Sequence, residues 1–164
     1  DGIKSFVCVN HVISNTVVAE RCRGFADGLG VELGNSMLDS GQDPAEIKNR
    51  VLAYLSANPK TEAILTLGPT SADPTIAALK ENGMAGDIYF GTFDLGTEIV
   101  NGIKSGIIQW GIDQQPFLQA YLPVVVLANY DRFGVLPGNN INSGPGFVTK
   151  EGLELVEKYA GQYR

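Results

Sequence analysis

Histidine and cysteine are scarce in this chain of 164 residues: His11 is the single histidine, and Cys8 and Cys22 are the two cysteines. Zinc sites need several nitrogen and sulfur ligands, so this supply argues against a metal site, and we expect neither a metal nor a cofactor. Cys8 lies in an apolar strand-like run and Cys22 on an apolar helical stripe. We therefore predict two buried free thiols rather than a disulfide.

The chain also lacks a cluster of basic residues. It has 12 Lys and Arg against 18 Asp and Glu, which gives a net charge of −6. Nucleic-acid binding relies on clustered positive charge, so no nucleic-acid partner is expected. The longest apolar run, around residues 121–128, is too short to cross a bilayer and contains Pro123. The chain begins with DGIKSFVCV and no signal-peptide pattern, as a mature chain would.

Catalytic signatures are missing as well. We find no G-x-S-x-G, no P-loop and no G-x-G-x-x-G, and GLGVELG has the wrong glycine spacing. A Ser-His-Asp triad would have to use His11, and no nucleophile is marked. Asp94 and Asp113 could share a crevice, but each lies where a helix cap is the simpler role. These absences predict a binding protein rather than an enzyme.

Strand-like and helical patterns alternate from the start of the chain. The strand-like runs are SFVCVN, NSML, EAILTL, DIYFGTF and GIIQWGI. Between them lie helical patterns at 16–29, in DPAEIKNRVLAYLSA, in SADPTIAALKENG and in a short helix through 98–103. This alternation predicts an α/β fold with a mostly parallel sheet flanked by helices.

The pattern changes after Pro116. FLQAYLPVVVLANYDRFG is helical in character but apolar nearly all round, which predicts a helix buried on more than one side. A connection rich in Gly, Pro and Asn follows, VLPGNNINSGPG. The chain then closes with FVTKEGLELVEKYAGQYR, for which we predict a short strand and a terminal helix.

Polar residues follow the predicted strands, and in a parallel sheet these positions meet at one edge. They are Asn10-His11, Ser40-Gly41-Gln42, Gly68-Pro69-Thr70, Thr92-Phe93-Asp94 and Asp113-Gln114. Amides, hydroxyls and a carboxylate suit a polyhydroxylated ligand, because each hydroxyl needs both a donor and an acceptor. Arg21, beside the apolar stripe of its helix, can reach over this edge with a fork of donors.

Each of these residues also has a purely structural interpretation. Arg21 could be a surface residue with its stem on apolar neighbours, and Asp94 could cap the following helix. Gln114 could simply open the next helix, His11 could be structural, and Phe93 could belong to the core. The residue pattern alone leaves both interpretations open.

Several segments together resemble the type I periplasmic sugar-binding proteins of ABC importers, the ribose/galactose-binding class. They are AERCRGFADGL, DPAEIKNRVLAYLSANPKTEAILTLG, GTFDLGTEIVNGIKSGIIQWGIDQQPFLQAYLPV and INSGPGFVTKE. Such proteins clamp ligand between two α/β lobes, and the resemblance covers only the C-terminal part. It implies a ligand-binding lobe at 1–114, a crossover helix and linker at 115–142 that would pack on the other lobe, and a returning strand and helix at 143–164.

The resemblance also implies roles for single residues. Arg21, four residues before the Phe of a GF pair, resembles the family's sugar-binding arginine. Asp94, with Phe93 beside it, resembles its ligand-accepting aspartate, and Gln114 its hinge glutamine. Further ligand-facing positions fall at Asn10, His11 and Gln42, and we add Gly68 at the same sheet edge as a candidate. Gly68-Pro69 stands where an Asn-Asp pair is usual, which puts a pentose ligand in doubt.

The function so implied is capture of a sugar in the periplasm and delivery to a membrane permease, without catalysis. One alternative is the ligand-sensing domain of a transcription regulator or chemoreceptor-type sensor, which shares the fold. Another is an enzyme on a flavodoxin-like fold. If the partner lobe is absent, the apolar residues of 117–131 predict a homodimer through that segment.

Overall fold

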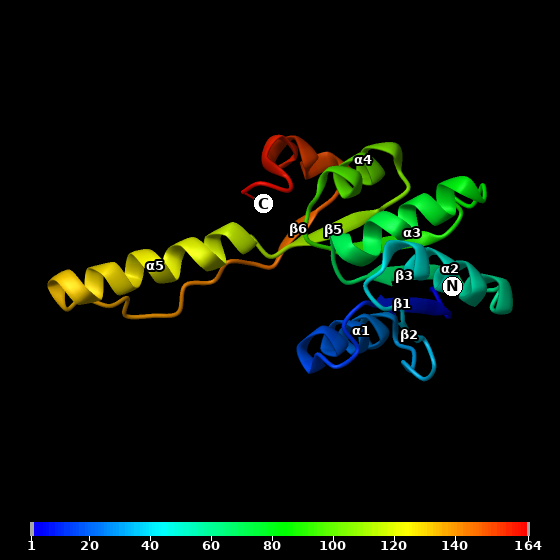
Figure 1. The fold of residues 1–164 in the computed structure, drawn as a ribbon, viewed down its shortest axis with the longest axis horizontal. Helices are drawn as coiled ribbons and strands as arrows, with labels where there is room; N and C mark the ends of the chain where they lie inside the picture. The colour runs from blue at the N-terminus through cyan, green and yellow to red at the C-terminus, as the bar shows by residue number, and fades with distance from the viewer. Residues whose placement is uncertain (1, 164) are drawn as a thin grey trace.

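The computed structural model, which describes residues 2–163, contains a six-stranded sheet of order β2-β1-β3-β4-β5-β6 (Figure 1). The first five strands pair in parallel, and β6 runs antiparallel to β5, so the predicted mostly parallel sheet is confirmed. The strands are β1 (Phe6–Asn10), β2 (Met37–Asp39), β3 (Ala63–Thr66), β4 (Tyr89–Phe93), β5 (Trp110–Asp113) and β6 (Gly146–Val148).

The helices that follow the strands start at recognisable signals. Asp43 accepts a hydrogen bond from the backbone N–H of Glu46 (2.9 Å) and caps α2, whose first residue is Pro44. Gly30 and Gly106 end α1 and α4 in the left-handed conformation. The helices are α1 (Thr16–Leu29), α2 (Pro44–Ala57), α3 (Pro69–Glu81), α4 (Thr97–Ser105) and α5 (Pro116–Phe133).

The predicted terminal helix is wrong: this segment forms two short 3-10 helices, η1 (Lys150–Leu155) and η2 (Glu157–Tyr159). Its buried residues Leu153 and Val156 are three apart, while Leu155 is 84% exposed. Val156 lies between the two short helices, where its burial with Leu153 holds the segment against the sheet.

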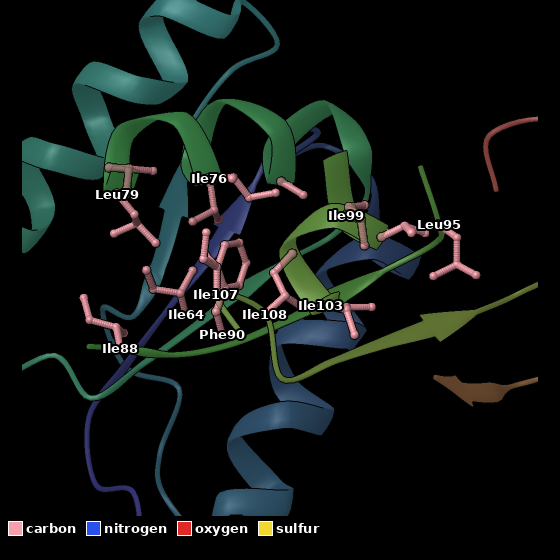
Figure 2. Close-up of a cluster of buried hydrophobic side chains, with 14 of the residues drawn as sticks. Ile64, Ile76, Leu79, Ile88, Phe90, Leu95, Ile99, Ile103, Ile107 and Ile108 are labelled. Carbon is pink, nitrogen blue, oxygen red and sulfur yellow. The ribbon is translucent and has the colours of Figure 1, made fainter. Parts of the chain in front are cut away.

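The two faces of the sheet carry separate clusters of buried residues, as the alternation of side chains along a strand requires. On one face, Ile64 and Phe90 from the strands pack against Ile76 of α3 and Ile99 and Ile103 of α4 (Figure 2). On the other face, α1 lies alone among the described helices. The second cluster centres on Phe6, Cys8, Cys22, Ala26, Ala63, Leu65, Leu67 and Trp110.

Cys8 of β1 and Cys22 of α1 form a disulfide across this second face. Both residues are fully buried, so the predicted burial is confirmed and the predicted free thiols are wrong. The cause is that the inward stripe of α1 lies directly over β1. This brings the two Cα atoms to 5.7 Å, a separation that a disulfide spans.

α5 leaves the sheet after β5 as a projecting arm, and residues 134–145 run back beside it to β6 (Figure 1). No residue of α5 is buried, so its predicted burial on more than one side is wrong for this chain. A groove of about 590 Å³ lies between helix and return segment, with Leu122, Val126, Leu136 and Ile141 among its lining. Within residues 2–163, no helix has the length and apolar character needed to span a membrane.

Candidate functional site

Three predicted site residues form one hydrogen-bonded chain beyond the carboxyl ends of β4 and β5. The Arg21 Nη2 group donates to Gln114 Oε1 (2.9 Å), and Gln114 Nε2 donates to Asp94 Oδ1 (2.7 Å). Arg21 comes from α1, 93 residues before Gln114. The predicted convergence of these residues is therefore confirmed, and we call the three side chains the Arg21–Gln114–Asp94 chain.

The guanidinium of Arg21 has two further contacts that hold it in place. Its Nη1 group donates to the backbone oxygen of Leu67 just after β3 (3.1 Å). Its central carbon lies 4.4 Å from the centre of the Phe93 ring, a cation–π arrangement. Phe93 is therefore both partly buried against the second cluster and part of the crevice wall.

Asp94 does not cap the next helix. Helix α4 begins at Thr97, and Gly96 occupies its N-cap position. Asp94 itself takes a left-handed backbone conformation with φ of 60°, and its N–H donates to the carbonyl of Ile112 (2.8 Å). Such a conformation costs about 1 kcal/mol or more outside glycine, although aspartate tolerates it better than most residues. The capping interpretation is thus wrong, and the carboxylate contacts Gln114 instead.

Gly68 leaves open the space between His11 and Asp94. A Cβ atom there would lie 3.7 Å from Asp94 Oδ2 and 3.9 Å from His11 Cε1. Gly68 also has φ of 151°, which other residues rarely adopt. Because Gly68 has no side chain, the imidazole of His11 and the carboxylate of Asp94 can face a common space.

His11 is half-buried at the same edge, with Nδ1 3.3 Å from the hydroxyl of Ser71. Burial, and then the positive charge of Arg21, lower the pKa of His11 below its usual 6.5. A neutral imidazole offers one donor and one acceptor, as a ligand hydroxyl requires.

The side chains of Asn10 and Gln42 form no hydrogen bond with Arg21, Gln114, Asp94 or His11 within the described part of the chain. Asn10 is fully buried; its Oδ1 accepts from the N–H of Val12 (2.9 Å), and its Nδ2 lies 3.6 Å from the Met37 sulfur. It therefore shapes the turn that carries His11. Gln42 is exposed after the edge strand β2, beyond β1.

Sequence reasoning missed supporting residues around the chain of hydrogen bonds. The hydroxyl of Ser71 accepts from the Leu67 N–H (3.2 Å), beside the carbonyl that holds Arg21. Gln119 Nε2 donates to the backbone oxygen of Gln114 (2.9 Å) and to Ser143 Oγ (3.0 Å). The first turn of a helix after Gly-Pro could have pointed to Ser71. No local pattern relates Gln119 to Ser143.

The assembled wall offers guanidinium N–H groups, a carboxylate, an amide and a neutral imidazole around an aromatic face. Among residues 2–163, no three His, Cys, Asp or Glu side chains gather where a metal could bind. A small hollow of about 250 Å³ adjoins the wall, between Phe93, Gln114, Gln119 and the 143–145 segment. Such a wall can hydrogen-bond a polyhydroxylated solute and stack on one of its faces.

The chain is similar to proteins of a known family. The profile of a family described as "Periplasmic binding protein domain" matches residues 1–132. A xylose/arabinose-binding protein of Sulfolobus acidocaldarius is 26% identical over 123 residues, which are 70% of this chain and 31% of that protein.

Solved structures agree on the fold. A carbohydrate transporter from Acidothermus cellulolyticus, in complex with myo-inositol, is 29% identical with a TM-score of 0.85, over 97% of this chain and 55% of that one. A periplasmic sugar-binding protein of an ABC sugar transporter from Legionella pneumophila is 25% identical with a TM-score of 0.75, over 87% and 53%. The chain thus spans about half the length of these proteins.

Proposed function

Because the chain belongs to the periplasmic binding protein domain family, we propose that it supplies one wall of a cleft that captures a sugar or similar polyhydroxylated solute. The observation that carries the proposal is the Arg21–Gln114–Asp94 chain. Three residues from distant parts of the sequence meet at the sheet edge, and all three stay partly exposed. A purely structural role would not need a guanidinium, an amide and a carboxylate in series there.

The ligand class follows from this chemistry. Arg21 presents N–H donors, Asp94 presents acceptors, and His11 presents Nε2, since its Nδ1 contacts Ser71, so vicinal hydroxyls are the matching groups. One carboxylate and one guanidinium balance each other, which favours a neutral solute over an anion. Sugars and the cyclitol myo-inositol fit, and the names of the relatives include both. The residues proposed to contact ligand are Arg21, Phe93, Asp94, Gln114, His11 and Gly68, with Asn10 and Gln42 in support.

The whole protein is proposed to hold a second lobe that faces this wall. Residues 1–114 form the ligand-binding lobe, 115–142 cross to the other lobe and pack on it, and 143–164 return. The exposed apolar side chains of α5 and its groove support this, because leaving them in water would be costly. We further propose that delivery to the permease of an ABC importer occurs in the periplasm, with no catalytic step.

The proposal is tested by calorimetry on the full-length protein with myo-inositol, D-xylose, L-arabinose and D-galactose. We expect micromolar or tighter binding of at least one, and loss of that binding in Arg21→Gln. No heat with any of the four, in protein shown to be folded, would contradict a sugar-binding role.

In the isolated 164-residue chain, the arm of residues 116–143 lacks that second lobe. We propose that two copies then associate through α5, since this hides the most apolar surface. Light scattering at rising concentration should show the mass of a dimer, and Val124→Glu with Leu127→Glu should restore the monomer. A monomer at millimolar concentration with α5 helical would rule this out.

A further inference from the structure

The buried side chains of α1 are smaller than those of α2, the helix of equal length on the other face of the sheet. The buried residues of α1 are Ala19, Cys22 and Ala26, whereas α2 buries Ile47, Val51 and Leu55. Alanine removes little apolar area from water, so its contribution to holding a helix is small. Val18, Phe25 and Leu29 of α1 also pack on the second cluster but stay partly exposed, so Cys22 is the one fully buried position of α1 with a covalent link to the sheet.

No described helix flanks α1 on its face of the sheet. A hollow of about 370 Å³ lies beside it, lined by Arg21 and Phe25 of α1 and by Trp110 and Phe147 of the strands, among others. The helices of the opposite face instead contact one another in series from α2 to α4. α1 thus lacks the lateral support that fixes the position of its counterparts.

From these observations we propose that the Cys8–Cys22 disulfide positions Arg21 for ligand binding. Cys22 follows Arg21 directly in the chain, and its partner Cys8 is fixed in β1, paired on both sides by β2 and β3. The bond therefore fixes the backbone one residue from the guanidinium-bearing Cα. The part of this inference that concerns ligand affinity rests on the proposed function.

The contacts of Arg21 leave little tolerance for movement. Its hydrogen bonds to Gln114 and Leu67 measure 2.9 and 3.1 Å. A shift of about 0.5–1 Å would carry both beyond the range of a hydrogen bond. An arginine side chain released from its contacts also gains rotamer entropy. Once α1 can shift, this entropy favours loss of the hydrogen bonds from Arg21 to Gln114 and Leu67.

The single histidine provides a built-in reporter that needs no ligand. His11 faces the crevice, and Arg21 is one of the causes that lower its pKa. The charged groups around it are Arg21 from α1 and Asp94 after β4, while Ser71 of α3 is its neutral contact. Withdrawal of the guanidinium removes a positive charge and should raise the pKa of His11.

The experiment is an NMR titration of His11 in the 164-residue chain, with the disulfide intact and in Cys8→Ala/Cys22→Ala. We expect the pKa of His11 to rise when the disulfide is removed, and to rise similarly in Arg21→Gln with the disulfide intact. The combined variant should show no additional rise. Arg23→Gln is the matched charge control, because Arg23 on the same helix pairs with Glu20 and should leave the pKa unchanged.

A structural role alone predicts a different pattern. If the disulfide merely stabilises the fold, its removal lowers the melting temperature but leaves the pKa of His11 where it was, and that result would overturn the proposal. Should the double alanine variant fail to fold, Cys8→Val/Cys22→Ala, which refills more of the buried space left by the two sulfurs, supplies the same comparison.

Affinity measurements on the full-length protein complete the test. With myo-inositol as probe, disulfide removal and Arg21→Gln should each weaken binding by roughly tenfold or more, and together by no more than either alone. Additive losses would show that the disulfide acts elsewhere than through Arg21. If no solute binds at all, the proposed function is wrong. The His11 titration still tests whether the disulfide positions Arg21, because it needs no ligand.

Discussion

Helices α4 and α5 are both rich in apolar residues, yet one is packed into the lobe and the other stands away from it. α4 has nine residues and buries Ile99, Val100 and Ile103. α5 has 18 residues and buries none. In α4 the apolar positions recur on one face and match one surface, whereas in α5 they surround the axis. The apolar content of a helix therefore does not by itself predict whether the helix packs against the sheet.

The comparison would be sharpened most by removing the same side chain from each region. Phe90→Ala empties a fully buried site of the lobe, and we expect a loss of about 3–5 kcal/mol in the free energy of unfolding. In the monomeric Val124→Glu/Leu127→Glu background, Phe133→Ala removes a side chain that is 71% exposed at the end of α5, and should change this free energy by less than about 0.5 kcal/mol. Urea unfolding measures both, and similar losses would contradict the contrast.

The second expected effect concerns ligand binding, which we assign to the lobe and not to the arm. In the full-length protein, Asp94→Ala should weaken sugar binding by about 1.5–3 kcal/mol, because hydrogen bonds to a charged group are lost. Asp131→Ala, on the exposed surface of α5, is the control and should leave affinity unchanged. Calorimetry decides: unaltered affinity in Asp94→Ala would remove that residue from the site.

Two glycines provide a matched test of packing density. A Cβ atom at Gly91 would fall 2.2 Å from the Trp110 ring, which stacks on Phe147 and donates to the Tyr89 hydroxyl. Gly91→Ala should therefore cost about 1–3 kcal/mol and shift the fluorescence of the single tryptophan. Gly138 of the arm has nothing within 4 Å, so Gly138→Ala should be nearly neutral. Equal stability of the two variants would argue against close packing at Gly91.

The smallest expected effect is a pH dependence confined to the lobe. Burial and Arg21 lower the pKa of His11 in the folded chain, so the unfolded chain binds a proton more readily. The contribution of His11 to the free energy of unfolding is fully present above pH 6.5, and it is lost as the pH falls below that value. Melting temperatures at about pH 5 and 7.5 should therefore differ more in the wild type than in His11→Gln. An identical difference in both would assign the dependence to other groups.

The sequence patterns predicted the sheet and the convergence of Arg21, Gln114 and Asp94 better than they predicted the helix environments. Alternating strands and helices determine a parallel sheet, and its edge then collects Asp94 and Gln114 from neighbouring strands. Arg21 was recognisable because it borders the apolar stripe of α1. These predictions succeed because each depends on local periodicity plus one topological rule.

The failures share a different cause. The Cys8–Cys22 bond depends on how α1 is seated over β1, and the left-handed turn at Asp94 depends on its hydrogen bond to Ile112. The exposure of α5 depends on which partner surface is present. Each is set by tertiary contacts between segments far apart in the chain, which periodicity within one segment cannot report.

The hydrogen bonds of Gln119 couple the arm mechanically to the binding wall. Two segments join the arm to the sheet, one after β5 and one before β6, and Gln119 ties the Gln114 carbonyl of the first to Ser143 of the second. Gln114 also carries the amide between Arg21 and Asp94. Gln119 of α5 thus links both connecting segments to the residue whose amide joins Arg21 and Asp94. If Gln114 contacts ligand as proposed, a rotation of α5 relative to the sheet would move that amide, and bound ligand would oppose the rotation.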